Sequence, residues 1–347
     1  MKRTEVKRVL SIILTGAMAL SLMACGNSTG STTSKATDTE SKPGKVYTMN
    51  VGSAVAESNP ANVALQSFKK KVEERTKGGV VVNVYPNSAL GSETDMLSQV
   101  TSGTLEATMQ MGAANWESYN AEADVALLPF LWTNIEDART AWAGDFGKRF
   151  TKEIIEPTGC KVLSIWESGF RHMTNNIRPV TVPDDIKGIK FRTNDNSMKT
   201  QMFKALNGSI IMMPFSEVFT SLQNGNIDGQ ENPLANIYTS SIQEVQKYLS
   251  LTGHMYDAAP FVCSQKWFAT LPVEYQNILM EEAGNAKEVD LKENDEAKFL
   301  GLIKSSKIKV NEVNRDAFQE KMTSVWKTFE DKYGKDWVDL AQSQNKK

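Results

Sequence analysis

Side chains able to carry out catalysis or hold a metal are few in this sequence. There are two histidines, His172 and His254, and the part expected to fold contains only Cys160 and Cys263. Neither pair has the spacing of a zinc site, and no nucleophile or phosphate-binding motif accompanies them. His172 lies beside Arg171 and could act as a base, but without a nucleophile we interpret it as structural. We therefore predict no catalytic residue, metal or cofactor.

One arginine raises the question of an anion-binding site. The stretch GIKFRT, residues 188–193, has the pattern of a short strand between a glycine and a polar turn, and it places Arg192 near its end. A guanidinium stays charged and needs acceptors for five N–H groups. Arg192 is either a solvated surface residue or part of a site that recognises an anion, and the residues alone leave both open.

Length and charge argue against nucleic-acid binding. The chain has 347 residues, which is enough for two domains, and a formal net charge of −2. The basic run at 69–71 is followed at once by Glu73 and Glu74, as on a solvated helix face. Export would allow a disulfide between Cys160 and Cys263, but two buried thiols are at least as good an interpretation.

The N-terminus has the order of a bacterial lipoprotein signal. Basic residues precede an apolar segment at 9–24, which is shorter than the ~20 residues of a membrane span. The segment ends in LMAC, which resembles a lipobox; the alternative is an ordinary secretory signal. We expect a signal peptide at 1–24, lipidation of Cys25 and a Ser/Thr-rich tether at 25–45. Acyl chains would then hold the protein on the extracytoplasmic face of the cell membrane, in a periplasm or at a Gram-positive surface.

Alternating periodicities predict an α/β layer at the start of the folded part. Strand patterns and helix patterns follow one another, which favours a parallel sheet. Ser92 is expected to cap the second helix. The predicted strands and helices are 46–54, 60–78, 80–86, 92–103 and 105–111.

The same pattern then returns with different residues. The predicted elements are strands at 160–168, 189–193 and 209–213, and helices at 197–208 and 216–225. Ser216 is expected to cap the last of these helices. Residues 272–306 have almost no helix breaker after Pro272, so they predict one long helix of ~50 Å.

Several segments, in their order and spacing, resemble the solute-binding subunits of TRAP transporters, the DctP-like family. The resemblance covers about 46–330, and LQNGNIDGQENP is particularly specific. The segments that carry it are YPNSALGSETDMLSQVTSG (85–103), LPFLW (128–132), GFRHMTNNIRPV (169–180), PDDIKGIKFRT (183–193), PFSEVFTSLQNGNIDGQENP (214–233) and EVQKYLSLTGH (244–254).

The resemblance implies a binding site for an organic acid. Arg192 would bind the ligand carboxylate through two parallel charge-assisted hydrogen bonds. Arg171 takes the position of a second binding-site arginine, with an ordinary ion pair between domains as the alternative. Asn232 matches a ligand-contacting asparagine, and since it precedes Pro233 it is also expected to cap a helix. Phe215 is expected to form an apolar wall.

Two further candidates and one departure concern the kind of ligand. Trp166 and Glu167 precede Arg171 and could stack on a sugar acid and hydrogen-bond its hydroxyls, or they could belong to the core or the surface. Gln110 and Met111 stand where the sialic-acid-binding branch has an acidic residue. A sialic acid ligand is therefore not expected.

The resemblance also implies the fold, which is of the α/β class and periplasmic-binding-protein-like. It would have two α/β domains of discontinuous chain, an interdomain ligand cleft and a long C-terminal helix. The first domain is expected at 46–168 and about 257–297, and the second at 169–256 and about 298–345.

The implied function is that of the extracytoplasmic solute-binding subunit of a TRAP-type secondary transporter. It would capture a C4-dicarboxylate or a sugar acid through the carboxylate and deliver it to the transporter membrane subunits. Two alternatives remain, a sensory ligand-binding lipoprotein and an exported hydrolase, and the missing nucleophile argues against the hydrolase. No enzymatic activity and no nucleic-acid partner are expected.

Overall fold

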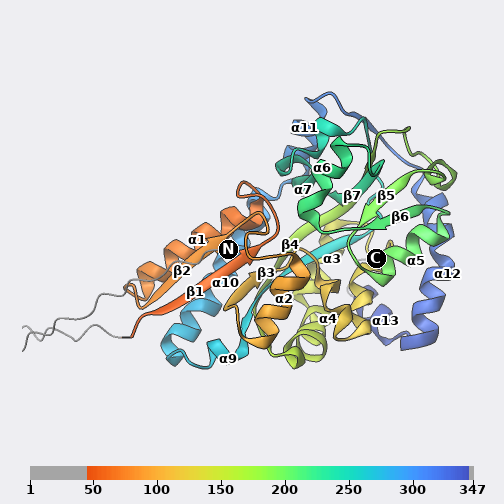
Figure 1. The fold of residues 1–347 in the computed structure, drawn as a ribbon. Coiled ribbons are helices and arrows are strands. Elements are labelled where there is room, and N and C mark those ends of the chain that lie inside the picture. Colours follow the sequence, from red (N-terminus) through yellow and green to blue (C-terminus); the bar gives the residue numbers. More distant parts are fainter. Residues whose placement is uncertain (1–44, 344–347) are drawn as a thin grey trace, which may run out of the picture. The chain divides into compact units, whose positions relative to one another are not determined.

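Two long antiparallel strands connect the two halves of the fold (Figure 1). They are seen in a computed structural model that describes residues 45–343. β4, Cys160–Asn175, pairs along its first part with β9, Tyr256–Ser264. Along its last part β4 pairs with β7, Gly229–Pro233, and β8, Tyr248–Ser250. The strand β4 therefore belongs to both halves.

The first half of the fold is a sheet in the order β2-β1-β3-β9. Strand β1 pairs in parallel with both β2 and β3, as the alternation of elements predicted. Ser92 caps α2 by accepting a hydrogen bond from the backbone N–H of Asp95, which confirms that prediction. The elements are β1 (Tyr47–Ser53), α1 (Pro60–Arg75), β2 (Val80–Tyr85), α2 (Glu93–Ser102) and β3 (Ala107–Met109).

The second half of the fold is a sheet in the order β4-β7-β5-β6, with β8 and β10 on the other side of β4. Strand β5 is parallel to both β6 and β7. The predicted cap at Ser216 is wrong, because Ser216 lies inside a 3-10 turn, Phe215–Glu217, that precedes α6. The elements are β5 (Lys190–Thr193), α5 (Ser197–Ala205), β6 (Ser209–Met212), α6 (Val218–Gln223), α7 (Leu234–Thr239), α8 (Ile242–Val245) and β10 (Lys309–Asn311).

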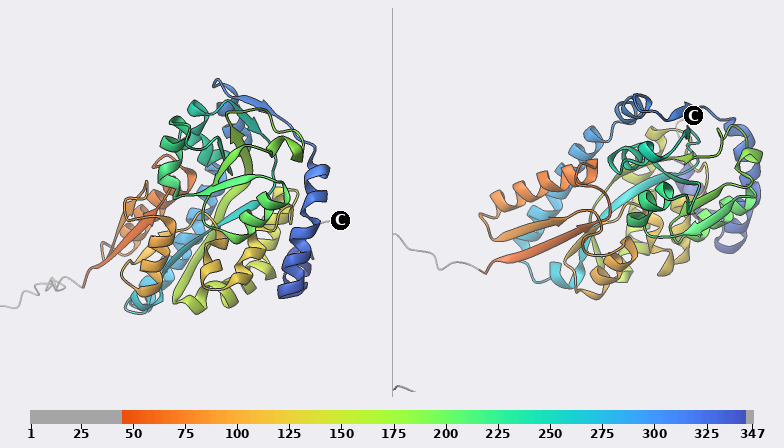
Figure 2. Two further views of the ribbon diagram at one scale, coloured as in Figure 1. Left: turned by 45° about the vertical axis from the view of Figure 1, so that its right-hand side comes forward. Right: turned by 45° about the horizontal axis from the view of Figure 1, so that its top comes forward.

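The long helix predicted over 272–306 is broken into two. α10, Val273–Glu293, lies beside α1 on the first half, and α11, Glu296–Lys304, packs against α7 of the second half (Figure 2). Asp295 caps α11, and the Asn294 side chain donates to two backbone carbonyls of β4. These side-chain hydrogen bonds compete with the helical backbone bonds and end α10. No glycine or proline stands at this point of the sequence to predict the break.

The remaining elements cover the sheet and its ends. An aromatic cluster of Trp132, Trp142, Phe146 and Trp337 packs edge to face between α3, α4 and α13. The helices are α3 (Ile135–Ala143), α4 (Asp145–Phe150), α9 (Gln265–Phe268), α12 (Arg315–Tyr333) and α13 (Asp336–Gln342), with 3-10 turns at Ala113–Ser118, Ala121–Leu127, Glu156–Thr158 and Pro183–Ile186 and a π turn at Thr151–Ile155.

Several predictions concern cysteines, boundaries and the N-terminus. Cys160 and Cys263 are both free and buried, which is the second of the two interpretations. The signal peptide, Cys25 and the tether lie outside the described residues, except for Lys45. No helix within 45–343 combines the length and apolar character needed to span a bilayer. The domain boundaries remain predictions, because the described part of the chain forms one compact unit.

Candidate ligand-binding site

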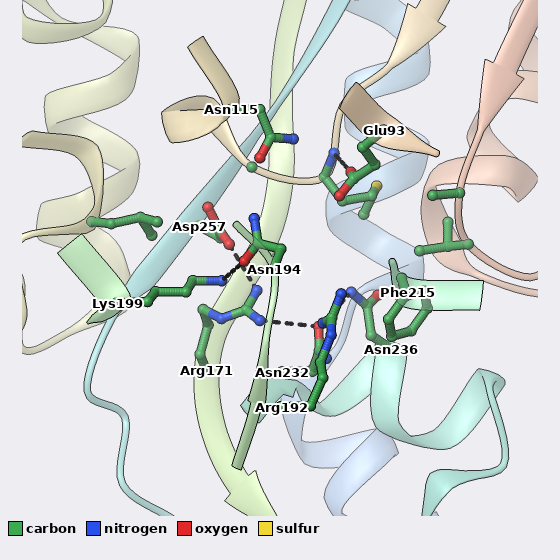
Figure 3. Close-up of a pocket in the computed structure, with 15 residues that line it drawn as sticks. Glu93, Asn115, Arg171, Arg192, Asn194, Lys199, Phe215, Asn232, Asn236 and Asp257 are labelled. Carbon is green, nitrogen blue, oxygen red and sulfur yellow. Dashed lines mark hydrogen bonds and ion pairs between the residues drawn. The ribbon is translucent and has the colours of Figure 1, made fainter. Parts of the chain in front are cut away.

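A polar pocket lies where the two halves of the fold meet, and charged and asparagine side chains form most of its wall (Figure 3). Its free volume is about 30 Å³. A wider space of about 300 Å³ adjoins it and shares Arg192 and Glu93 with it. The charged lining residues are Glu93, Arg171, Arg192, Lys199 and Asp257.

Strand β5 positions Arg192 by simple alternation. Phe191 turns to one face of the sheet and packs against Phe203 of α5, with ring centroids 5.1 Å apart. The next side chain must turn to the opposite face, and Arg192 there lines the pocket. The Phe215 ring, at 5.8 Å from the Arg192 guanidinium carbon, forms part of the same wall.

Arg192 is a buried cation without an anionic partner. Arg192 is only 3% exposed. Its Nε and Nη2 both donate to the Met213 carbonyl, at 3.0 and 2.7 Å. No carboxylate within the described residues forms an ion pair with it, and Nη1 has no hydrogen-bond partner there. Burial lowers the pKa of Arg192 to about 10, so the guanidinium remains charged at neutral pH. This arrangement suits an incoming anion.

Arg171 lies in the same pocket wall but is fully engaged by protein carboxylates. It forms a bidentate ion pair with Glu231 of β7, and its Nη1 donates to Oδ2 of Asp257 at 2.8 Å. Burial opposes the charge, but Glu231 and Asp257 together raise the pKa of Arg171 above its ordinary value. The ion-pair interpretation of Arg171 is therefore the one that the geometry favours.

Lys199 is a pocket residue that sequence reasoning missed. It lies on α5, is 2% exposed, and its Nζ is 2.8 Å from Oδ1 of Asn194 and 3.1 Å from Oε1 of Glu231. Burial, together with the charge of Arg171, lowers the pKa of Lys199. Burial alone would raise the pKa of Glu231, but Arg171 and Lys199 hold it well below its usual value. A lysine in a short amphipathic helix gave no signal of this role, since such lysines are mostly solvated.

Asn232 lines the pocket from a strand and does not cap a helix. It belongs to β7, and α7 begins only after Pro233, which occupies the N-cap position without a side-chain bond. Its Oδ1 accepts from Arg171 at 3.2 Å and from Asn236 at 3.4 Å. The predicted contact position is thus compatible with the fold, but the predicted cap is wrong.

The structure places Trp166 and Glu167 away from the pocket. The Trp166 indole is buried in the core of the first half and donates to the Ala283 carbonyl at 3.0 Å. Both oxygens of Glu167 accept from Arg139 at 2.8 Å, and one also accepts from the Tyr256 hydroxyl. Their hydrogen-bonding capacity is used inside the fold, so the ligand-binding role considered for them is corrected to a structural one.

The two histidines are also part of the packing. Nδ1 of His172 accepts from the backbone N–H of Gly253 at 3.0 Å, and His254 lies against Glu231 and Thr252. Burial, with the neighbouring charge of His254, lowers the pKa of His172 to about 3, so it is neutral at physiological pH. Their contacts are those of structural residues.

Four other pocket residues had no sequence signal of their own. Glu93 follows the capping serine of α2, and Gly112 and Asn115 lie in the turn after β3. Asp257 is the second residue of β9, a strand that the sequence analysis did not predict. Each reaches the pocket only because distant segments are brought together by the crossing strands.

A polar pocket between two α/β halves joined by crossing strands is typical of a ligand-binding protein. The family model DctP, described as bacterial extracellular solute-binding protein, family 7, matches residues 51–332. The chain therefore belongs to this family of TRAP transporter solute-binding proteins, as its motifs indicated.

Individual relatives agree with this assignment. The chain is 33% identical over 276 residues to the 2,3-diketo-L-gulonate-binding periplasmic protein YiaO of Escherichia coli, covering 78% of this chain and 83% of that one. It is 35% identical over 280 residues to an uncharacterized protein of Sinorhizobium fredii, covering 80% of this chain but 51% of the relative. The chain thus spans about half the length of that second relative.

Solved structures show the same fold. The sugar acid binding protein DctPAm of Advenella mimigardefordensis, in complex with galactonate, has a TM-score of 0.83 and 32% identity, with 87% of this chain and 99% of that chain covered. A TRAP periplasmic solute binding protein of Sulfurospirillum deleyianum with bound succinate has a TM-score of 0.82 and 28% identity, with 87% and 100% covered. The predicted periplasmic-binding-protein-like fold with two domains is confirmed.

Proposed function

We propose that this protein is the solute-binding subunit of a TRAP-type secondary transporter and captures a small organic acid through its carboxylate. The observation that carries the proposal is Arg192, a buried guanidinium that no carboxylate of residues 45–343 neutralises. An isolated buried charge is costly, and a ligand carboxylate would remove that cost while using the free Nη1. The relatives above support the same ligand chemistry, since a sugar acid and a dicarboxylate both offer a carboxylate.

Capture requires the two halves to move apart and close again. The pocket has a free volume of about 30 Å³ and lies beside a wider space of about 300 Å³, so we expect the two halves to separate for an organic acid to reach Arg192. The two halves also meet at the cleft edge. There the backbone N–H of Ser197 in α5 donates to Oε1 and Oε2 of Glu117, at 3.1 and 3.0 Å. Ligand entry would break such contacts, and closure around the ligand would restore them.

The expected location and partners follow from the same proposal. Lipidation at Cys25 would hold the protein on the extracytoplasmic face of the membrane, and the closed, loaded form would dock on the transporter membrane subunits. Mass spectrometry of the mature protein should find acyl chains on Cys25, and Cys25→Ser should release the protein or leave an unprocessed precursor. An unmodified Cys25 in fully soluble wild-type protein would contradict the anchor and leave ligand capture untouched.

The binding function is tested by calorimetry and thermal unfolding with a panel of organic acids. A ligand present at 100 times its Kd should add ~2.7 kcal/mol to the free energy of unfolding. The recovered ligand should be chemically unchanged, because the protein is proposed to bind and not to catalyse. If no organic acid binds, or if a bound acid is converted to product, the proposal is wrong.

A further inference from the structure

We propose that the pocket selects a polyhydroxy monocarboxylate, such as an aldonate, and discriminates against dicarboxylates, because it offers one unpaired cation and several unpaired acceptor oxygens. The inference rests on the proposed function, which places the ligand carboxylate at Arg192. The inference concerns the other groups of the ligand, which the rest of the pocket wall would recognise. The charge of the wall and the position of its free acceptors carry the argument.

The charges of the pocket leave room for a single ligand carboxylate. Two cations and two anions neutralise one another within the described residues, and they are Arg171, Lys199, Glu231 and Asp257. Arg192 then contributes one unpaired positive charge, and Glu93 contributes a negative charge elsewhere in the wall. A second ligand carboxylate would therefore be buried without a free cation and near a carboxylate, which is strongly unfavourable.

Asp257 presents an unused acceptor beside the pocket. Its Oδ2 accepts from Arg171 at 2.8 Å, but its Oδ1 is buried and has no hydrogen-bond partner among the residues described. Buried acceptors are rarely left unsatisfied, so this oxygen calls for a donor. A ligand hydroxyl can supply one, whereas a ligand carboxylate cannot and would be repelled.

A missing side chain leaves space next to this acceptor. A Cβ atom at Gly112 would lie 3.1 Å from Oδ1 of Asp257 and 3.5 Å from Oδ1 of Asn115. Gly112 itself lines the pocket, and its extended backbone does not demand glycine. The glycine is therefore explained by space, and the space it leaves is bordered by two acceptor oxygens.

Two further acceptors continue the pattern. Nδ2 of Asn115 donates to Gln110 at 2.8 Å, so its Oδ1 is the atom turned toward Gly112. Oε1 of Glu93 accepts from the Met111 backbone N–H at 2.8 Å, and its Oε2 has no hydrogen bond within the described chain. Acceptors from three side chains need donors from several positions of one ligand, which is the chemistry of a polyol chain.

A matched series of ligands tests the selectivity directly. Calorimetry on the full mature protein would compare D-galactonate, D-gluconate, L-gulonate, D-erythronate and D-galacturonate with hexanoate, succinate and galactarate. Hexanoate has the carboxylate without hydroxyls, and galactarate has the hydroxyls of galactonate with a second carboxylate. At least one polyhydroxy monocarboxylate should bind about 100-fold or more tightly than all three comparison acids.

Two variants test the residues that make the discrimination. Gly112→Ala should weaken the best polyhydroxy ligand by about tenfold or more, since its methyl group covers the Asp257 acceptor. Gly284→Ala is the control, because a Cβ there meets nothing within 4 Å. Glu93→Gln keeps the acceptor for Met111 but removes a charge, and it should raise the affinity for galactarate relative to galactonate by about tenfold. Such a ratio does not respond to a general loss of stability.

The outcomes separate this inference from the proposed function. Tightest binding of succinate or galactarate, or equal binding of hexanoate and the aldonates, would overturn the selectivity and leave carboxylate capture standing. An unchanged ratio in Glu93→Gln would also count against it. If none of the carboxylates binds, the proposed function fails and the inference fails with it.

Discussion

Arg171 and Arg192 are both buried in one pocket wall, yet they have opposite surroundings. Arg171 is held by Glu231 and Asp257, whereas Arg192 finds a single acceptor among residues 45–343, the Met213 carbonyl. The first arginine is part of the construction of the wall, because it ties β4 to β7 and β9. The second is stabilised incompletely by the protein, and we propose that it is left for a ligand. The same residue type would then serve stability in one place and recognition in the other.

The comparison predicts its largest effect for Arg171→Ala. Removing Arg171 leaves Glu231 and Asp257 buried with less compensation, so the free energy of unfolding should fall by about 3–5 kcal/mol. Urea denaturation would measure the loss. A whole protein is stable by roughly 5–15 kcal/mol. If the free energy of unfolding of the variant lies within about 1 kcal/mol of the wild-type value, Arg171 is not the structural member of the pair.

Arg192→Ala should act on binding and spare the fold. Removing one partner of a desolvated charge pair costs about 2–5 kcal/mol of binding free energy. The affinity for the best organic acid should therefore fall roughly 30-fold to several thousand-fold. The free energy of unfolding without ligand should not decrease, because an uncompensated buried charge is removed. Arg192→Lys is the matched control for charge and should also bind poorly, because the planar fork is lost. Near wild-type affinity of Arg192→Ala in calorimetry would contradict the assignment of Arg192 as the ligand-binding arginine.

A smaller effect is expected at the cleft edge, where carboxylates of the first half meet α5. Burial, together with Asp124, raises the pKa of Glu117 to about 8 from the ordinary value of 4.5. The folded state binds this proton more tightly than the unfolded state. The contribution of Glu117 to the free energy of unfolding is therefore fully present below pH 4.5 and is lost as the pH rises through about 8. The effect should be on the order of 1–2 kcal/mol after solvent screening.

Unfolding measured between pH 5 and 8 would show this dependence, and Glu117→Gln should flatten it. The groups that face Glu117 include Asp124, Asp195 and the Ser197 N–H. A profile that is unchanged in the variant would assign the pH dependence to another buried acid, such as Asp290, whose pKa burial raises to about 8.

The smallest effect on binding is predicted for Trp166→Phe. The substitution removes the hydrogen bond to Ala283 and should cost about 1 kcal/mol of stability. Since the indole lies outside the pocket, Kd should stay within about twofold of the wild type. A calorimetric loss comparable with that of Arg192→Ala would return Trp166 to the binding site.

Sequence reasoning found the local features of the fold and the site. The β-branched run of β2, the capped start of α2 and the short strand with Arg192 follow from neighbouring residues alone. Motif resemblance then brought Arg171, Asn232 and Phe215 to one pocket.

Contacts between distant segments could not be predicted in the same way. In the sequence Lys199 has the pattern of a surface lysine. In the structure its amine lies 3.1 Å from Glu231, which comes thirty-two positions later in the chain. Trp166 and Glu167 precede Arg171 in the sequence, but their partners Ala283 and Arg139 come from other elements and turn both side chains away from the pocket. The break after α10 depends likewise on bonds from Asn294 to β4.

β4 runs through both halves of the fold, whereas β9 pairs only with its first part. The pairing of β4 with β9 shifts register between Glu167 and Gly169, and Gly169 adopts a φ of 105°. A bulge with a left-handed glycine bends and twists the strand that contains it, so we expect this point of β4 to influence how often the empty protein is closed. Apparent affinity scales with that closed fraction. Substitutions at Gly169, which is not itself a pocket residue, would then tune uptake to the concentration of solute that a bacterium meets.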